Sequence, residues 1–130
     1  MHAFIWIAIG GALGSVARHG VSVAFIERLS SNAAMWATLA VNISGSLLIG
    51  FVATLGQPEG GFLQHPNMRL FLMVGICGGY TTFSAFSLQT LELIRMGDWL
   101  MAGGNVLLSV CGTVLAVAVG HKLALLFQGT

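Results

Sequence analysis

Charged side chains are scarce in this sequence, and their scarcity decides the class of protein. Of 130 residues, five are Lys or Arg and four are Asp or Glu, so only 7% of the chain is charged. A soluble domain of this size carries about 25% charged residues. A net charge of +1 also lacks the basic excess of a nucleic-acid-binding protein. With 56% of its residues hydrophobic, the chain is predicted to be an integral membrane protein surrounded by lipid.

Cysteine and histidine are too few and too scattered for a disulfide framework or a metal cluster. Cys77 and Cys111 both fall inside apolar stretches, and no two of the four histidines stand at metal-ligand spacing. Paired carboxylates are missing, and no serine or threonine has a base beside it that would activate a nucleophile. We therefore predict that the chain is not an enzyme.

Four long uncharged runs divide the chain, at residues 1–17, 29–58, 70–91 and 99–121. Each run is near or above the roughly 18–20 residues that cross a bilayer as a helix, the first only by continuing past Arg18. The sequence thus predicts an all-α membrane protein with four transmembrane helices, at about residues 4–26, 34–55, 69–95 and 99–125. They form one domain that covers residues 1–130.

The charges that flank these helices give no preferred orientation. With four spans, Arg69 and Lys122 lie on one side of the membrane, and Arg28 and Arg95 lie on the other. The two sides carry equal numbers of these basic residues, so the positive-inside rule predicts no orientation. If the chain inserts both ways up, an antiparallel homodimer is available, with its two-fold axis in the membrane plane. The sequence leaves open the alternative that other signals set a single topology.

The third span contains a segment that weakens a helix at its centre. Gly78 and Gly79 are flexible, and Thr81 and Thr82 are β-branched, with hydroxyls that compete for backbone groups. A break at membrane depth frees backbone groups that hydrocarbon cannot satisfy, so it persists only where protein buries it or where it lines a watery path. We predict that the third helix is unwound over residues 78–82, in mid-membrane. Carbonyl groups freed by two such breaks, meeting at a two-fold axis, suit a hard cation such as Na⁺.

Uncharged polar residues form a stripe on each of two spans, and two aromatic residues follow the break. Phe83 and Phe86 stand three apart, which places both rings on one helix face. The stripes repeat every four residues, as Thr38, Asn42 and Ser46 in the second span and Asn105, Ser109 and Thr113 in the fourth. Hydroxyls and amides replace part of an anion's water shell without trapping it, and aromatic ring edges are weakly positive. The pattern favours an anion pathway; the alternative is that the stripes only hold the helices together.

The first span combines a close-packing motif with a deep arginine. Gly10 and Gly14 form a GxxxG pair that lets helix backbones approach, and Arg18 continues the same row. An arginine in hydrocarbon costs at least about 2.5–3.5 kcal/mol, so Arg18 is a candidate functional residue. The alternative is that Arg18 extends to the headgroups and acts as an anchor.

The segment GGYTTFSAFS at residues 78–87 resembles the signature of the small bacterial fluoride channels, the Fluc or CrcB family, whose usual form is close to GGxTTFSTFS. The likeness covers the whole chain. Residues 10–14 with Arg18 resemble the family's first helix, Thr38 with Val41 and Asn42 its second, and Ser109 with Thr113 its fourth.

The resemblance implies a dual-topology homodimer in the bacterial inner membrane, with two pores through which F⁻ leaves the cytoplasm passively. Phe83 and Phe86 would form a phenylalanine box and Asn42 would contact the ion. Ser109 and Thr113 would form a polar track, with Thr38 and Thr82 as further pathway candidates and Arg18 in a vestibule. Carbonyl groups of Gly78 and Thr81 from both subunits would hold a structural Na⁺. Gln89 stands where the family often has Glu, so this chain keeps hydrogen bonding at that position but lacks the acid's charge.

The sequence leaves three functions open besides a fluoride channel. A small dual-topology multidrug exporter coupled to protons needs a membrane-embedded carboxylate, and the nearest one, Glu92, lies at the end of the third span. A membrane enzyme that acts on lipids and a purely structural helix bundle are the other two.

Overall fold

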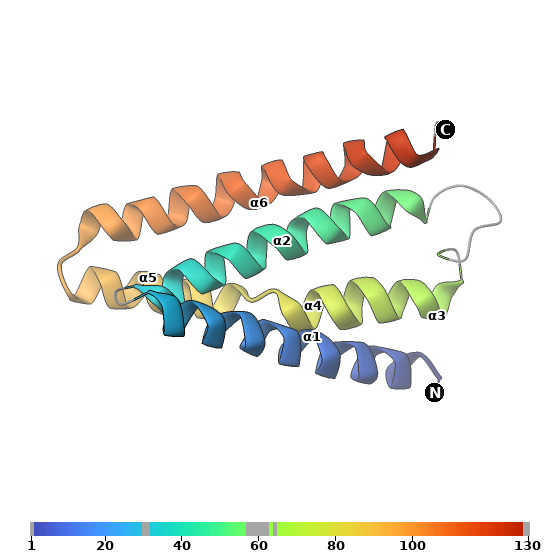
Figure 1. Ribbon diagram of the computed structural model, residues 1–130, viewed down its shortest axis with the longest axis horizontal. Coiled ribbons are helices and arrows are strands. Elements are labelled where there is room, and N and C mark those ends of the chain that lie inside the picture. Colours follow the sequence, from blue (N-terminus) through green and yellow to red (C-terminus); the bar gives the residue numbers. More distant parts are fainter. Residues whose placement is uncertain (1, 30–31, 57–62, 64, 129–130) are drawn as a thin grey trace.

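The computed structural model describes residues 2–29, 32–56, 63 and 65–128, and these residues form helices and no strand. The elements in chain order are α1 (His2–Arg28), α2 (Ala33–Leu55), α3 (Pro66–Arg69), η2 (Leu70–Cys77), α4 (Gly78–Tyr80), α5 (Phe83–Arg95) and α6 (Trp99–Gln128). The elements from α3 to α5 follow one another as a single rod (Figure 1). The described residues thus contain four helical rods that are long and apolar enough to cross a membrane. This confirms the predicted all-helical, multi-pass membrane protein, with every predicted bound within three residues of the observed one.

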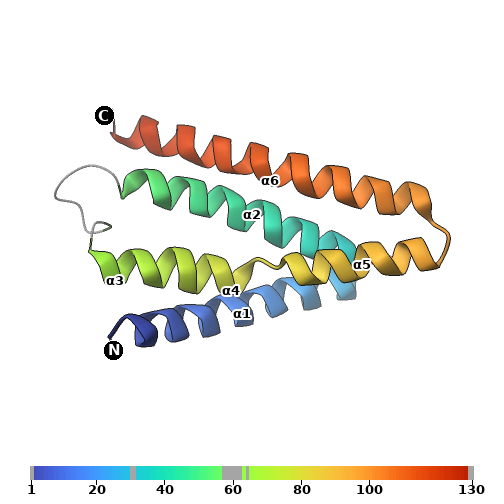
Figure 2. The ribbon, with the colours of Figure 1, turned by 180° about the vertical axis from the view of Figure 1, so that it is seen from behind.

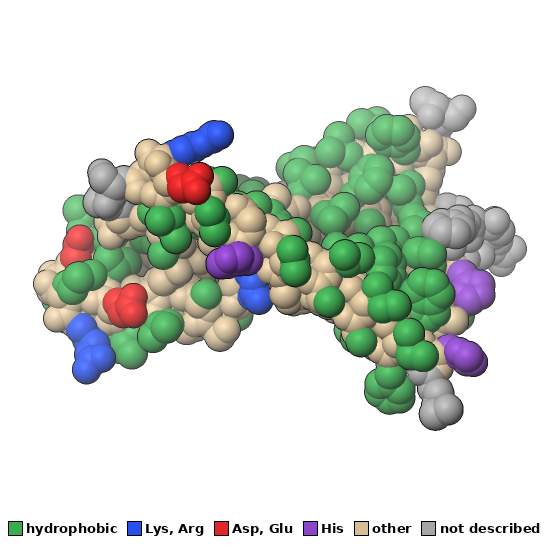
Figure 3. Space-filling view, turned by 60° about the horizontal axis from the view of Figure 1, so that its bottom comes forward, with side chains coloured by type: hydrophobic (Ala, Val, Ile, Leu, Met, Phe, Trp, Pro, Cys, Tyr) green, Lys and Arg blue, Asp and Glu red, His purple; other side chains and the backbone are tan. Residues whose placement is uncertain are grey.

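The four rods alternate in direction. The start of α1, the end of α2, the start of α3 and the end of α6 lie at the same end of the bundle (Figure 1), as the count of four spans requires. Seen from behind, α2 lies between α6 and the third rod (Figure 2). Acidic and most basic side chains gather toward one end of the face shown in Figure 3, while apolar side chains cover much of the rest. An apolar surface of this kind costs nothing in lipid, because hydrocarbon surrounds it.

Glycine lets α1 press directly onto the third rod. A Cβ atom on Gly10 would lie 2.5 Å from the Phe71 carbonyl oxygen and 2.9 Å from Gly75 Cα, and one on Gly14 would collide with the Ile76 carbonyl oxygen. From the other side, a Cβ on Gly79 would lie 2.5 Å from the Gly11 carbonyl oxygen. The close approach predicted from the GxxxG pair is therefore confirmed. Gly50 of α2 and Gly120 of α6 pack in the same way, against backbone of the facing helix.

The third rod departs from a regular α-helix in two places. η2 is π-helical, so that the amide of Gly78, which caps its end, donates to the carbonyl oxygen of Met73, five residues back. Beyond α4, Thr81 (φ −79°, ψ 158°) and Thr82 (φ −153°, ψ 117°) have extended backbones. The non-helical stretch is shorter than the predicted 78–82, because Gly78 and Gly79 remain helical. Gly79 serves close packing against α1, and the chain leaves the helix only at the two β-branched threonines.

Candidate functional site

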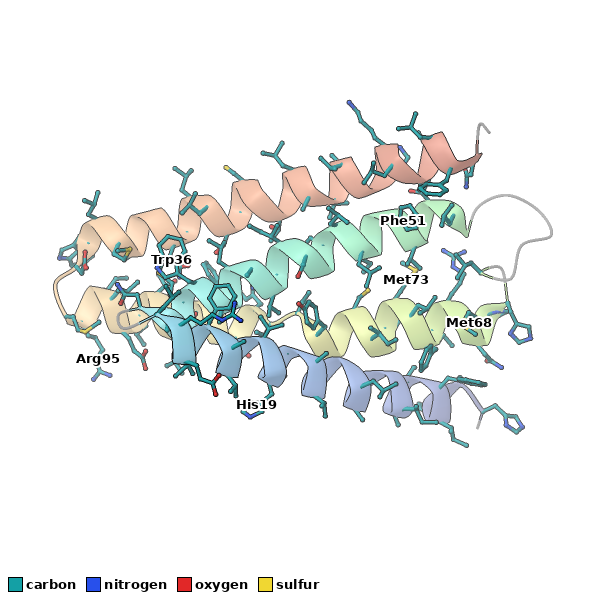
Figure 4. All side chains as sticks on the ribbon, in the orientation of Figure 1. His19, Trp36, Phe51, Met68, Met73 and Arg95 are labelled. Atoms are coloured by element: carbon teal, nitrogen blue, oxygen red, sulfur yellow. The ribbon has the colours of Figure 1, made fainter. Side chains whose placement is uncertain are left out.

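A cavity of about 360 Å³ opens beside the extended pair Thr81 and Thr82. Its walls come from α2, from the third rod on both sides of the interruption, and from α6. It gathers eight residues that the sequence marked as candidates: Asn42, Gly78, Thr81, Thr82, Phe83, Phe86, Ser109 and Thr113. The other lining residues are Gly45, Ser46, Ile49, Met73, Cys77 and Val110. Met73, one of these lining residues, extends from η2 toward α2 (Figure 4). No described lining residue is charged.

Asn42 pairs with both backbone polar groups of Thr82, in the interruption. Its Nδ2 donates to the Thr82 carbonyl oxygen at 3.0 Å, and its Oδ1 accepts from the Thr82 amide at 2.8 Å. A backbone that leaves a helix in apolar surroundings needs such partners, because an orphaned amide or carbonyl costs several kcal/mol in hydrocarbon. The sequence placed Asn42 in the polar stripe of the second span but did not reveal this partner, which lies 40 residues away.

The carbonyl groups of Gly78 and Thr81 are two whose helical donors bind side chains instead. In a continuous helix they would accept from the amides four residues on, those of Thr82 and Ala85. The Thr82 amide instead donates to Asn42 Oδ1 at 2.8 Å, and the Ala85 amide donates to Thr82 Oγ1 at 3.2 Å. These are the same two carbonyl groups that the family resemblance assigns to a cation. Hard cations prefer such oxygen donors, so the chemistry of this pair fits Na⁺.

Phe83 and Phe86 lie side by side at the start of α5. Their ring centroids are 5.2 Å apart with an interplanar angle of 52°, and both residues line the cavity, as helical spacing predicted. Their environments differ, because Phe86 is 8% exposed whereas Phe83 is 77% exposed. Within a single chain, therefore, one ring belongs to the core and the other stands outside it.

A row of hydrogen bonds extends the polar lining along α6. Thr113 donates to the Ser109 carbonyl oxygen at 2.6 Å, and the Ser109 hydroxyl donates to Asn105 Oδ1 at 3.5 Å. Asn105 is 2% exposed and donates from Nδ2 to Thr90 Oγ1 at 2.9 Å. Thr90 in turn donates to the carbonyl oxygen of Phe86 at 2.8 Å. The sequence pattern revealed the α6 stripe but not Thr90, which lies on α5 and belongs to neither polar stripe.

Thr38 and Arg18 are the two candidates that do not line the cavity. Thr38 lies one turn before Asn42, is buried, and accepts from Gln89 Nε2 at 2.9 Å. Gln89 Nε2 also donates to the Ala34 carbonyl oxygen at 3.1 Å, while Gln89 Oε1 is buried without a partner. Arg18 is half-buried on α1, and its neighbour His19 points away from the bundle (Figure 4). The Gln89 amide thus bridges α2 and α5.

Comparison with known proteins gives a consistent assignment over nearly the whole chain. A family model described as CrcB-like protein, Camphor Resistance (CrcB), matches residues 5–121. A protein of Methylocella silvestris named fluoride-specific ion channel FluC is 49% identical over 121 residues, which cover 93% of this chain and 92% of that protein.

Two further relatives carry the same name. The protein of Opitutus terrae is 49% identical over 124 residues, covering 95% of this chain and 93% of its own length. That of Gluconobacter oxydans is 51% identical over 119 residues, covering 91% and 81%. The match therefore includes all four rods and the interruption between α4 and α5. The chain belongs to the CrcB family.

Proposed function

We propose that this protein is a fluoride-specific channel that lets F⁻ leave the cytoplasm passively, down its electrochemical gradient. The observation that carries the proposal is the cavity beside Thr81 and Thr82, which gathers Asn42, both phenylalanines and the polar residues of α6. Relatives at 49% identity over most of the chain are named fluoride-specific ion channels, which supports the same function here.

The lining has the chemistry of a route for a small anion. Its polar members are hydroxyls and an amide, which offer hydrogen bonds without the fixed charge that would hold the ion in place. Asn42 commits one amide hydrogen to the Thr82 carbonyl oxygen, and its second amide hydrogen is left for an ion. The edges of Phe83 and Phe86 add weakly positive hydrogens. In this proposal Ser109 and Thr113 continue the route along α6, and Thr38 and Arg18 act nearer its ends.

The proposed channel is an antiparallel homodimer with two pores, because a single chain leaves its route without a wall. Phe83 is 77% exposed, and Gly78, in the middle of the third rod, is exposed, with only the Met73 carbonyl oxygen, at 3.8 Å, near the position of an added Cβ. An inverted second copy would cover both residues in mid-membrane. The balanced flanking charges, Arg69 and Lys122 against Arg28 and Arg95, allow this arrangement. The dimer is expected to lie in the bacterial inner membrane.

A structural Na⁺ at the two-fold axis completes the proposal. The Gly78 and Thr81 carbonyl groups, freed by Asn42 and by the Thr82 hydroxyl, would hold it together with their counterparts in the second copy. The ion would supply positive charge that binds the two interrupted helices together. The proposed transport uses no energy source, and an inside-negative potential favours anion exit by about 2.3 kcal/mol per charge per 100 mV.

The lining of the cavity favours a channel over a proton-coupled exporter. Such an exporter exchanges protons for substrate at an embedded carboxylate. No described residue of the cavity lining carries a carboxylate, and Glu92 is exposed, two turns beyond Phe86 on α5.

Proteoliposomes test the proposal directly. We expect rapid F⁻ efflux with little Cl⁻ efflux, in the absence of ATP and of a proton gradient. Equal and negligible efflux of the two ions would overturn the channel, and dependence on a proton gradient would favour the exporter. Reactive single-cysteine tags, counted from each side of intact membranes, test the two-way insertion, which predicts that every tag labels partly from both sides.

A further inference from the structure

We propose that Tyr80 and Ser44 position the carbonyl groups of Gly78 and Thr81, and so set how tightly the proposed site binds Na⁺. The inference rests on the proposed function, because the cation site is part of it. Tyr80 is the last residue of α4, and it stands between the two carbonyl-bearing residues in the chain. Fixing Tyr80 therefore restricts how those two oxygens can be placed relative to each other.

A hydrogen bond ties Tyr80 to α2. The Tyr80 hydroxyl lies 3.0 Å from Ser44 Oγ. Ser44 gives its own hydrogen to its helix, since its Oγ lies 2.8 Å from the Ala40 carbonyl oxygen. A serine hydroxyl has a single hydrogen, so Tyr80 is the donor and Ser44 the acceptor.

Two glycines hold the rest of Tyr80 in place. A Cβ on Gly45 would lie 3.1 Å from Cδ1 of the Tyr80 ring and would collide with the Thr81 methyl group, so the ring packs directly on the α2 backbone. On the opposite side, a Cβ on Gly14 of α1 would lie 2.8 Å from the Tyr80 backbone nitrogen. The residue is thus gripped between α1 and α2, with its hydroxyl as the polar contact.

Together with Asn42, this contact brackets the extended segment. Asn42 fixes the backbone of Thr82 through two hydrogen bonds, and the Tyr80–Ser44 bond fixes the residue before Thr81. A hard cation needs its oxygen ligands at a narrow range of distances, so a loose end on either side would weaken binding.

A double-mutant cycle tests the inference through the Na⁺ dependence of dimer stability. The thermal midpoint of the detergent-solubilised protein is measured while Na⁺ replaces N-methylglucamine, for Tyr80→Phe, Ser44→Ala and the double variant. We expect each single variant to raise the Na⁺ concentration for half-maximal stabilisation by about two- to tenfold, because each removes the same hydrogen bond. The double variant should shift this concentration no further than either single variant does. Ser22→Ala, which removes a hydroxyl that donates to the Arg18 backbone carbonyl oxygen within α1, is the matched control and should leave the curve in place.

Two results would overturn the inference, and they differ in what else they affect. If the variants lower the midpoint equally at every Na⁺ concentration, the Tyr80–Ser44 bond only stabilises the fold. If the wild-type midpoint does not respond to Na⁺, the cation site fails and this inference fails with it. The channel itself is tested separately, by F⁻ efflux from the same preparation.

Discussion

Replacing Asn42 separates two roles that this residue can play in the channel. The family resemblance gives Asn42 a contact with the ion, while the structure places both ends of its amide on the backbone of Thr82. Asn42→Ala removes both hydrogen bonds, so the Thr82 amide and carbonyl lose their partners. If Asn42 braces the interruption, this change must lower stability as well as flux.

The expected loss of stability follows from the two groups left unsatisfied. A buried donor or acceptor without a partner costs about 1–3 kcal/mol, so two of them cost about 2–6 kcal/mol when fully buried. Asn42 and Thr82 are only half-buried beside a cavity that accommodates water, so we expect the lower end, about 2–3 kcal/mol. Asn42→Asp keeps the acceptor for the Thr82 amide, but it sets a carboxylate oxygen against the Thr82 carbonyl and adds negative charge to the lining. We expect this variant to abolish F⁻ flux at neutral pH.

The assay pairs F⁻ efflux from proteoliposomes with the thermal midpoint of the purified protein. Asn42→Ala should reduce both, whereas Ser46→Ala, one turn further along the same lining, should leave the midpoint unchanged. Reduced flux at an unaltered midpoint for Asn42→Ala would refute the brace and leave only the ion contact. Unaltered flux and midpoint would remove Asn42 from both roles.

Substitutions at the phenylalanine pair, at Gly14 and at Gln89 test other parts of the structure. Phe83→Ile and Phe86→Ile should each abolish F⁻ flux while the dimer still elutes intact, and unchanged flux in both would remove the ring pair from the mechanism. Gly14→Ala should prevent α1 from docking, because its methyl group would meet backbone of the third rod. Gly20→Ala, with open space at the Cβ position, should be tolerated. Equal thermal midpoints for the two variants would contradict the packing. Gln89→Met loses two donated hydrogen bonds but also the buried Oε1 that has no partner, so the midpoint should change by the equivalent of about 1 kcal/mol or less. A loss of several times that size would show that the bridge to Ala34 and Thr38 is essential.

Some parts of this structure follow from local sequence alone. The uncharged runs between the few charges fix where the four rods begin and end, because bilayer thickness sets the length of a helix that crosses it. The Gly10 and Gly14 pair also predicts a close contact without knowledge of the partner, since any side chain larger than glycine keeps helix backbones apart. The spacing of Phe83 and Phe86 likewise fixes their common face through the helical repeat.

Other parts depend on which helices meet. Gly78 and Gly79 suggest flexibility in the sequence, yet they stay helical because α1 packs against Gly79. The π-helical geometry of η2 has no signal in its apolar sequence.

The sequence by itself determined that this chain is a four-helix membrane protein whose third helix is weak near Thr81 and Thr82. Helix length and the cost of charge in lipid are local properties, and they can be read residue by residue. Only the tertiary structure decided that Asn42 satisfies the extended backbone, that Gln89 binds Thr38, and that Tyr80 reaches Ser44. Each of these bonds joins residues 36 to 51 positions apart, and a hydrogen bond forms only when packing brings its donor and acceptor within about 3 Å.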